Sequence, residues 1–507
     1  MTTRTKNTWL NVLGGLAVKG SGFLTAFITR TTFLYILGIE YAGVASVFTN
    51  VLTVLSFAEL GIGTAITYAL YKPIAENDNA QICKLMNAYR KIYATIGIVI
   101  FLIGLCLIPF LKYVIKETLN INEDLRIVYL LYLLNTVVSY FLIYKSTFLT
   151  AMQKDYLVSK YKVSISIVKT VIECVSLVIF RNFLIYLVVS MIGTFIQNMV
   201  IAKTAEREYP VLKQRTKARL ESAERKRLFN DTRALALYKV SGTVLNGTDS
   251  ILVSSFFGTA SAGILGNYSL IINQVYSFVM LAFTATSASV GNLAATSDNQ
   301  HQYCVFRRML FISFWIYCFC TTSLWTLLNP FMHVWQSGQH MFSDAIIALM
   351  VIEFYLRGMM SPITQFRTSN GLFVHGKYRP LIMAIMNIVI SVLLSEKIGI
   401  AGILLGTIIS RVATQIWYDP WLIFKHVFQI SIFHYIKDYV LYGVVALLCC
   451  CVTSAILKAF CLEEGIMKVL FGSVLCILVP NVVVVVAFHR SEPFKATMCL
   501  FRNMLGK

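Results

Sequence analysis

The feature that most constrains this chain is a succession of apolar stretches, each long enough to cross a lipid bilayer. A membrane-spanning helix needs roughly 20 apolar residues, and about fourteen such stretches follow one another here. They are residues 9–29, 41–70, 89–111, 127–149, 163–181, 183–202, 234–257, 264–290, 306–329, 345–366, 380–396, 400–418, 438–457 and 467–488. With 57% hydrophobic and only 13% charged residues, they predict an all-α polytopic membrane protein and exclude a soluble multidomain enzyme.

The net charge of +20 comes from 44 Lys and Arg against 24 Asp and Glu. Basic residues collect on the cytoplasmic loops of membrane proteins. When alternate loops are counted, about 31 of the 44 basic residues fall on one side and about 8 on the other. The larger group includes both termini, which predicts that both ends of the chain are cytoplasmic. The excess charge therefore reflects topology, and we expect no nucleic-acid partner.

Motifs for soluble chemistry are absent from the sequence. It contains no GxxxxGK[ST] phosphate loop, no GxSxG nucleophile elbow and no HExxH metal helix. The 12 Cys include no CxxC pair and lie mostly inside apolar runs, where Cys behaves as a small hydrophobic residue. We expect no catalytic site, no bound metal and no cofactor, with coupling to an H+ or Na+ gradient left open.

Short matches between the two halves indicate an internal duplication. Leu37-Gly38 followed by Ala42-Gly43-Val44 matches Phe257-Gly258 followed by Ala262-Gly263-Ile264, at an offset of 220. Ile192-Gly193-Thr194 matches Leu405-Gly406-Thr407, at an offset of 213. Repeats of six helices have the same orientation in the membrane.

The duplication divides the chain into four predicted parts. Residues 1–202 form an N-terminal six-helix bundle, 203–233 a cytoplasmic connector, 234–425 a C-terminal six-helix bundle, and 426–507 two accessory helices and a cytoplasmic tail. We expect the two bundles to lie parallel around a central cavity, with the two accessory helices at the periphery.

Ionisable residues inside the predicted spans are the candidates for function, because each costs about 2.5–3.5 kcal/mol in mid-bilayer. The basic candidates for substrate binding are Lys19, Arg30, Lys239, Arg357 and Arg411. The acidic candidates for ion coupling or charge pairing are Glu59, Asp249 and Glu353. Basic groups predominate, which favours a mildly cationic cavity and an amphipathic anion as substrate, since Arg and Lys both bind phosphate oxygens.

Structural roles compete with binding for several of these charges. Lys169 and Glu173, like Glu353 and Arg357, are spaced i,i+4 and can neutralise each other on one helix face. Three further cations lie near helix ends, where long side chains can snorkel to the membrane interface. These cations are Arg30, Lys239 and Arg367.

Short motifs in both halves resemble a known family. The first half contains Arg30, Leu37-Gly38, Tyr41-Ala42-Gly43, Glu59-Leu60-Gly61-Ile62-Gly63 and Leu70-Tyr71-Lys72-Pro73. The second half contains Thr248-Asp249, Gly266-Asn267-Tyr268, Gly291-Asn292-Leu293, Phe366-Arg367 and Gly376-Lys377-Tyr378-Arg379-Pro380. Over residues 10–425 the chain resembles the polysaccharide transporter family of the multidrug/oligosaccharidyl-lipid/polysaccharide exporter superfamily, in particular its O-antigen and capsule repeat-unit flippases.

The resemblance implies a non-enzymatic flippase in the bacterial cytoplasmic (inner) membrane. Its substrate would be an undecaprenyl-diphosphate-linked oligosaccharide, moved from the cytoplasmic to the outer leaflet by alternating access. Basic lumen residues bind the lipid diphosphate in this family, a role that maps onto Lys19, Arg357 and Arg411. Membrane lipids, a polysaccharide polymerase and glycosyltransferases would be its partners.

Three other functions remain open from the sequence. A cation-coupled drug or organic-cation antiporter of the same superfamily would prefer an acidic cavity and usually twelve helices. A membrane-bound polysaccharide polymerase or glycosyltransferase would need larger outer loops than the roughly fifteen-residue ones found here. A scaffold that transports nothing is the third alternative.

Overall fold

The computed structural model is built of helices and describes residues 3–56, 62–111, 115, 121, 123–152, 154–213, 222–372, 375–376 and 378–505. Within these ranges the side chains of residues 3–12, 222–246 and a few single positions are not described. Glu59 and the side chain of Lys239, two of the predicted site residues, therefore lie outside the described part of the chain.

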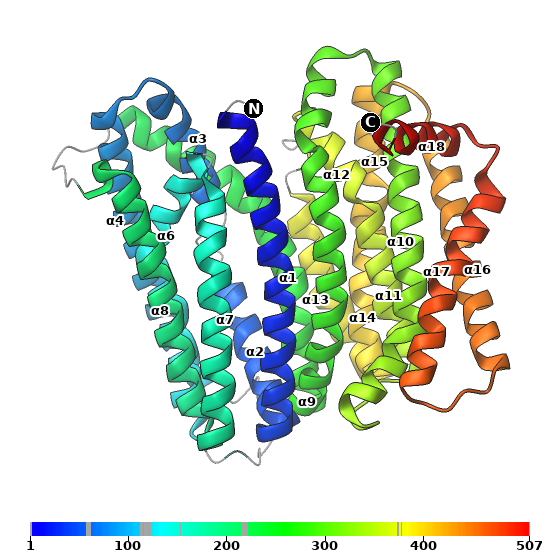
Figure 1. Cartoon of the computed structure of the whole chain (residues 1–507), viewed down its shortest axis with the longest axis horizontal. Coiled ribbons are helices and arrows are strands. Elements are labelled where there is room, and N and C mark those ends of the chain that lie inside the picture. Colours follow the sequence, from blue (N-terminus) through cyan, green and yellow to red (C-terminus); the bar gives the residue numbers. More distant parts are fainter. Residues whose placement is uncertain are drawn as a thin grey trace. The chain divides into compact units, whose positions relative to one another are not determined.

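Packing divides the chain into two units, which we call unit 1 (Met1–Gly266) and unit 2 (Asn267–Lys507). Unit 1 contains α1 (Thr3–Leu37), α2 (Ile39–Leu55), α3 (Ile62–Ala75), α4 (Asn79–Leu107), α6 (Leu125–Ala151), α7 (Asp155–Phe180) and α8 (Phe183–Glu208) (Figure 1). It also contains α9 (Ser222–Thr296) as far as Gly266. Unit 2 contains the rest of α9, then α10 (Asn299–Gln336), α11 (Asp344–Met359), α12 (Ser361–Ser369), α13 (Arg379–Ile398), α14 (Ile400–Arg411), α15 (Tyr418–Ile423), α16 (Phe433–Ala459), α17 (Ile466–Phe488) and α18 (Glu492–Leu505).

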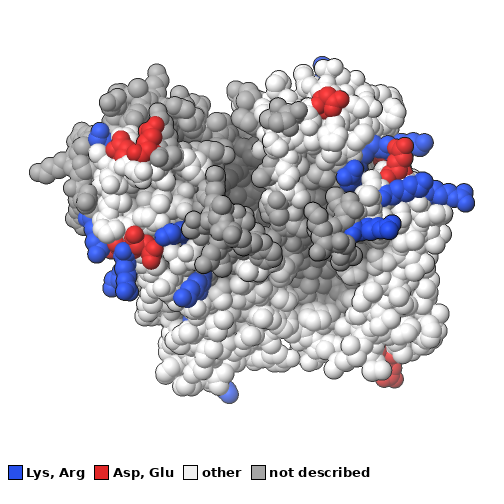
Figure 2. Space-filling model, turned by 45° about the horizontal axis from the view of Figure 1, so that its top comes forward, with Lys and Arg blue, Asp and Glu red and all other residues white. Residues whose placement is uncertain are grey.

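Among the described residues, 11 helices are long and apolar enough to cross a membrane, and Ile39–Leu55 is a shorter apolar helix. Wide uncharged areas of the surface, as contact with lipid requires, adjoin groups of Lys, Arg, Asp and Glu side chains (Figure 2). The prediction of an all-α polytopic membrane protein is confirmed. The two six-helix bundles around a cavity, and the four-part division of the chain, stay predictions.

Several helix boundaries differ from the sequence prediction, and three of the differences concern the spans near residues 41–70, 400–418 and the C-terminal tail. Within the stretch 41–70, α2 ends at Leu55, and α3 covers Ile62–Ala75 among the described residues. The stretch 400–418 continues to Phe428 through two π-helical segments, Val412–Ile416 and Phe424–Phe428. The predicted C-terminal tail contains α18, which lies across one end of unit 2 (Figure 1). A search for long apolar runs misses such a helix, because its apolar residues occupy only one face.

The duplicated glycine motifs occupy equivalent positions and meet each other within unit 1. Gly38 (φ 95°) separates α1 from α2, and Gly258 (φ 87°) interrupts α9. Both have a positive φ, which glycine adopts without steric cost. Five residues further on, a Cβ on Gly43 would lie 1.9 Å from the carbonyl oxygen of Thr259, and one on Gly263 would lie 3.0 Å from the backbone nitrogen of Gly43. Glycine at both positions therefore permits two helix backbones to touch.

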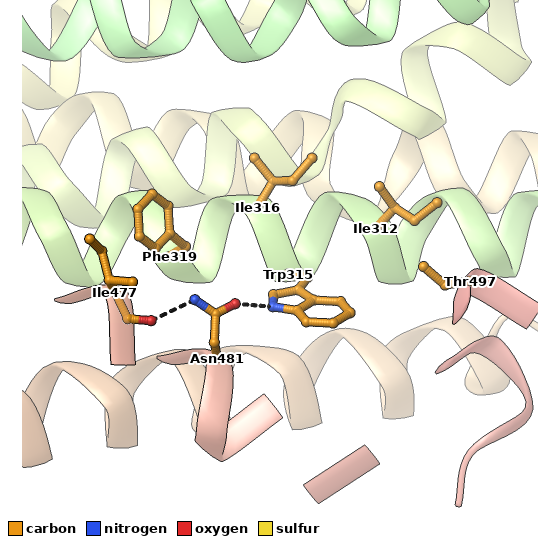
Figure 3. Close-up of a pocket in the computed structure, with 7 residues that line it drawn as sticks. All are labelled: Ile312, Trp315, Ile316, Phe319, Ile477, Asn481 and Thr497. Carbon is orange, nitrogen blue, oxygen red and sulfur yellow. Dashed lines mark hydrogen bonds between the residues drawn. The ribbon is translucent and has the colours of Figure 1, made fainter. Parts of the chain in front are cut away.

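In unit 2, α18 and α17 pack on the long helix α10 through a mixed aromatic and polar contact. The indole nitrogen of Trp315 donates to Oδ1 of Asn481 at 2.9 Å (Figure 3). Phe494 of α18 stacks on the Trp315 ring. Beside this contact is a groove of about 420 Å³ with apolar walls. Arg307 of α10 lies 3.7 Å from both Asp438 and Glu492, which ties α10 to α16 and α18 at the same end.

Candidate substrate site

The most concentrated group of predicted site residues lies on α11 and the helices around it in unit 2. Glu353 and Arg357 are one turn apart on α11, so they project from the same face. Pro362, in the first turn of α12, follows a break at Met360 that ends α11 soon after Arg357. Arg411 is the last residue of α14, which packs against α11.

Arg357 is held flat against an aromatic ring. Its guanidinium carbon is 3.8 Å from the centroid of the Tyr276 ring, and Nη2 donates to Oδ1 of Asn273 at 3.0 Å. Both partners lie on α9, and the Arg357 side chain is only half-buried. A guanidinium over an aromatic face is stabilised by the quadrupole of the ring. This contact fixes the plane of the cation without neutralising its charge.

Arg411, in contrast, is buried and has an acidic partner. Its Nη2 donates to Oε1 of Glu353 at 2.7 Å, and its Nη1 donates to Oε1 of Gln415 at 3.0 Å. The side chain of Arg411 is 8% exposed and that of Glu353 is 19% exposed. The sequence suggested that Glu353 could pair with Arg357 on its own helix. In the structure Glu353 is paired with Arg411 of α14. Glu353 and Arg411 therefore form an ion pair, and Arg357 lies one turn from Glu353 on α11.

Arg30 of unit 1 bridges the contact between the two glycine motifs. It donates to the carbonyl oxygens of Ala42 at 3.2 Å and Gly263 at 3.1 Å, and to Oγ of Ser46 at 3.3 Å. These acceptors come from α2 and from α9 just after the Gly258 break. A guanidinium that donates to helix carbonyls in this way joins three helix segments. A structural role therefore accounts for the contacts of Arg30.

The other predicted residues are spread over unit 1. Lys19 is exposed on α1, and Asp249 is partly buried on α9. The predicted i,i+4 pair on α7 is formed, with Nζ of Lys169 3.6 Å from Glu173 and 3.1 Å from the hydroxyl of Thr194. Among the described residues, no group of three or more His, Cys, Asp or Glu is placed to hold a metal ion.

One charged cluster was missed by sequence reasoning. Asp419 of α15 is buried between Arg367 and Arg379, with its Oδ1 2.6 Å and 3.2 Å from their respective nitrogens. Of the two roles that the sequence left open for Arg367, snorkelling is excluded, because its side chain is 1% exposed and also donates to the carbonyl of His375 at 2.7 Å. The three residues lie near predicted helix ends, so their hydropathy resembled that of ordinary interfacial charges. Only their tertiary packing distinguishes them.

The helices and charged clusters define a polytopic α-helical membrane protein with buried polar groups in both units. The sequence matches no protein-family model and no curated protein. Its fold resembles that of the lipid II flippase MurJ in an inward closed conformation, with TM-score 0.67 and 13% identity over 94% of this chain and 99% of that one.

Multidrug transporters have a similar fold. The MATE transporter DinF-BH gives TM-score 0.59 at 16% identity, covering 83% of this chain and 97% of its own. A variant of the Vibrio cholerae MATE transporter VcmN gives TM-score 0.58 at 13% identity, covering 83% and 95%. The likeness shows that this chain shares the fold of these transporters and of the flippase. These structures are of transporters and a flippase, not of enzymes.

Proposed function

We propose that this chain is a flippase for undecaprenyl-diphosphate-linked oligosaccharides in a bacterial cytoplasmic membrane. It would move the repeat units of a surface polysaccharide, O-antigen or capsule, to the outer leaflet by alternating access. Residues 1–202 and 234–425 would form the two bundles, with 203–233 as their connector and 426–507 as the accessory helices and tail.

The observation that carries this proposal is the half-buried guanidinium of Arg357 within a membrane-spanning segment. It is oriented by Tyr276 at 3.8 Å and by Asn273 at 3.0 Å. A planar, oriented guanidinium can make two parallel hydrogen bonds to phosphate oxygens. Arg357 is therefore the first residue we assign to the lipid diphosphate, and Lys19, which the family resemblance gives the same role, is kept as a further candidate. Arg30 and Arg411, whose contacts are structural, and Lys239 are weaker candidates.

The chemistry of such a substrate explains why it needs a protein. Each unpaired polar group moved into hydrocarbon costs several kcal/mol, and an oligosaccharide diphosphate carries many. The polyprenyl tail can stay in lipid while the head group passes through a polar path. With a cytoplasm-negative potential, outward movement of an anion gains about 2.3 kcal/mol per charge per 100 mV. Coupling to H+ or Na+ through Asp249, Glu353 or Glu59 would add to this driving force.

A reconstitution experiment tests the proposal. Purified protein reconstituted in liposomes should move a labelled undecaprenyl-diphosphate oligosaccharide from the inner to the outer leaflet. An enzyme added outside the liposomes then gains access to the labelled sugar. Arg357→Ala should reduce the rate about tenfold or more, since a hydrogen bond to a charged group contributes about 1.5–3 kcal/mol. Lys397→Ala, which removes an exposed cation at the end of α13, should leave the rate unchanged. Full activity of Arg357→Ala would remove this residue from the substrate site.

A cation-coupled drug antiporter is the second candidate, because the MATE transporters share the fold. A drug-sensitive bacterium expressing the chain decides between the two. Increased resistance to organic cations, together with no movement of the lipid-linked sugar in liposomes, would favour the antiporter. Transport of the sugar by the purified chain alone would also exclude a scaffold that only organises a polymerase and glycosyltransferases.

A further inference from the structure

A second groove lies on unit 1 between α6 and α8, remote in sequence from every residue assigned to the substrate. It has a volume of about 460 Å³, within the range of about 300–1,000 Å³ typical of small-molecule sites. Its apolar wall consists of Val138, Phe141 and Leu142 from α6 with Phe195 and Met199 from α8. Phe141 is 45% exposed and Phe195 is 41% exposed, so the groove is open along its length.

One end of the groove is charged. Lys145, one turn beyond Phe141 on α6, forms an ion pair with Glu206 of α8, and Lys203 lies beside them. The Lys145 side chain is 11% exposed and Lys203 is exposed. Because Glu206 balances one lysine, the mouth of the groove retains one positive charge. An apolar channel with a cationic end is complementary to an acyl chain attached to an anionic head group.

The positions of Lys145 and Lys203 along their helices agree with a lipid ligand whose phosphate lies at the membrane surface. Lys145 precedes the end of α6 by six residues and Lys203 precedes the end of α8 by five, which is about 8–9 Å along a helix. That places both ammonium groups near the level of the lipid phosphates when the helices span the bilayer. The positive-inside count assigns this end to the cytoplasmic leaflet.

We propose that the α6–α8 groove binds one anionic phospholipid of the surrounding membrane, with an acyl chain along Phe141, Leu142 and Met199 and the phosphate between Lys145 and Lys203. This lipid is a resident of the site and is not transported. The groove on α10 and α17, whose lining contains no charged side chain, provides an internal contrast, because it offers nothing that selects a head group.

The test measures lipid binding by the purified full-length chain, without any transport step. Native mass spectrometry should show one phosphatidylglycerol retained about fivefold more tightly than phosphatidylcholine with the same acyl chains, the advantage that one lysine provides near an anionic phosphate. Lys203→Ala should abolish this preference. Lys160→Ala removes an exposed lysine of α7 outside the groove and should leave it intact. Met199→Trp should fill the groove and weaken binding of both lipids.

Three outcomes would overturn the proposal. Equal binding of both lipids by the unaltered chain would show that the groove does not select an anion. If Lys203→Ala and Lys160→Ala lose the preference for phosphatidylglycerol equally, the preference comes from general surface charge and not from the groove. Displacement of phosphatidylglycerol by an equimolar amount of undecaprenyl phosphate would make the groove part of the substrate path. Since none of these measurements involves translocation, they stand whether or not the chain proves to be a flippase.

Discussion

Arg357 and Arg367 lie ten residues apart on consecutive helices, yet their surroundings differ completely. Arg357 is half-buried, and its described partners, the ring of Tyr276 and the amide of Asn273, carry no charge. Arg367 is almost fully buried and donates to the carboxylate of Asp419 at 2.6 Å. The guanidinium of Arg357 is partly accessible and is held by a ring and an amide, while the hydrogen bonds of Arg367 are made to buried groups of the protein.

This difference shows which intramembrane charges can serve a ligand. A buried ion pair is not itself strong evidence of stabilisation, but removing one partner leaves an uncompensated charge at a cost of about 3–5 kcal/mol. Changes around Arg367 should therefore alter folding. Changes around Arg357 should alter transport and leave folding nearly intact. The predictions below test this contrast, from the largest effect to the smallest.

The largest effect is expected for Asp419→Asn. The substitution keeps the size of the side chain but removes the negative charge that lies between Arg367 and Arg379. We expect a loss of stability of about 3–5 kcal/mol, seen as poor accumulation in the membrane or a lower melting temperature in detergent. Glu396→Gln, at an exposed position on α13, is the matched control. A melting temperature equal to that of the control would show that the cluster is not needed for folding.

A smaller loss of stability is expected for Glu353→Gln. The amide oxygen of Gln can still accept from Arg411, but the charge that balances this buried guanidinium is gone. We expect a loss of about 1–3 kcal/mol, with transport retained in proportion to the folded protein. If the melting temperature is unchanged while dependence on an H+ or Na+ gradient disappears, Glu353 acts in coupling and its pairing with Arg411 is secondary.

Arg357→Lys separates the charge of the side chain from its shape. Lysine keeps the positive charge but cannot stack as a plane on Tyr276 or bind phosphate through two parallel hydrogen bonds. We expect a transport rate about five- to tenfold below that of the unaltered chain, a smaller loss than in Arg357→Ala, with the same melting temperature. Liposome translocation and melting curves on the same preparations provide both readings. A rate equal to the parent's would mean that charge alone is required.

Much of the fold is predictable from the sequence, because the spans are long and strongly apolar and the glycine motifs repeat in the same order at similar offsets. Gly38 and Gly258 have the same backbone conformation, and Gly43 and Gly263 pack together. The candidate list also contained Arg357, Glu353 and Arg411, which the structure brings together on α11 and α14. The partners within that list were not predictable, since the spacing of charges along one helix does not indicate what a neighbouring helix presents. Asp419 was overlooked for the same reason.

The smallest effect, and the finest test of the contrast, is expected for Tyr276→Leu. The leucine still packs against Phe354, a ring that Tyr276 meets edge-on at 6.5 Å, but it removes the aromatic face under the Arg357 guanidinium. A cation–π contact at a partly accessible site contributes about 0.5–1 kcal/mol. Since Arg357 keeps its bond to Asn273, we expect a transport rate about two- to fivefold lower, with little change in melting temperature. Tyr276→Phe retains the ring and should transport like the parent. If Phe impairs transport as much as Leu does, the hydroxyl of Tyr276 is the important group and the stacked guanidinium is not what orients the substrate.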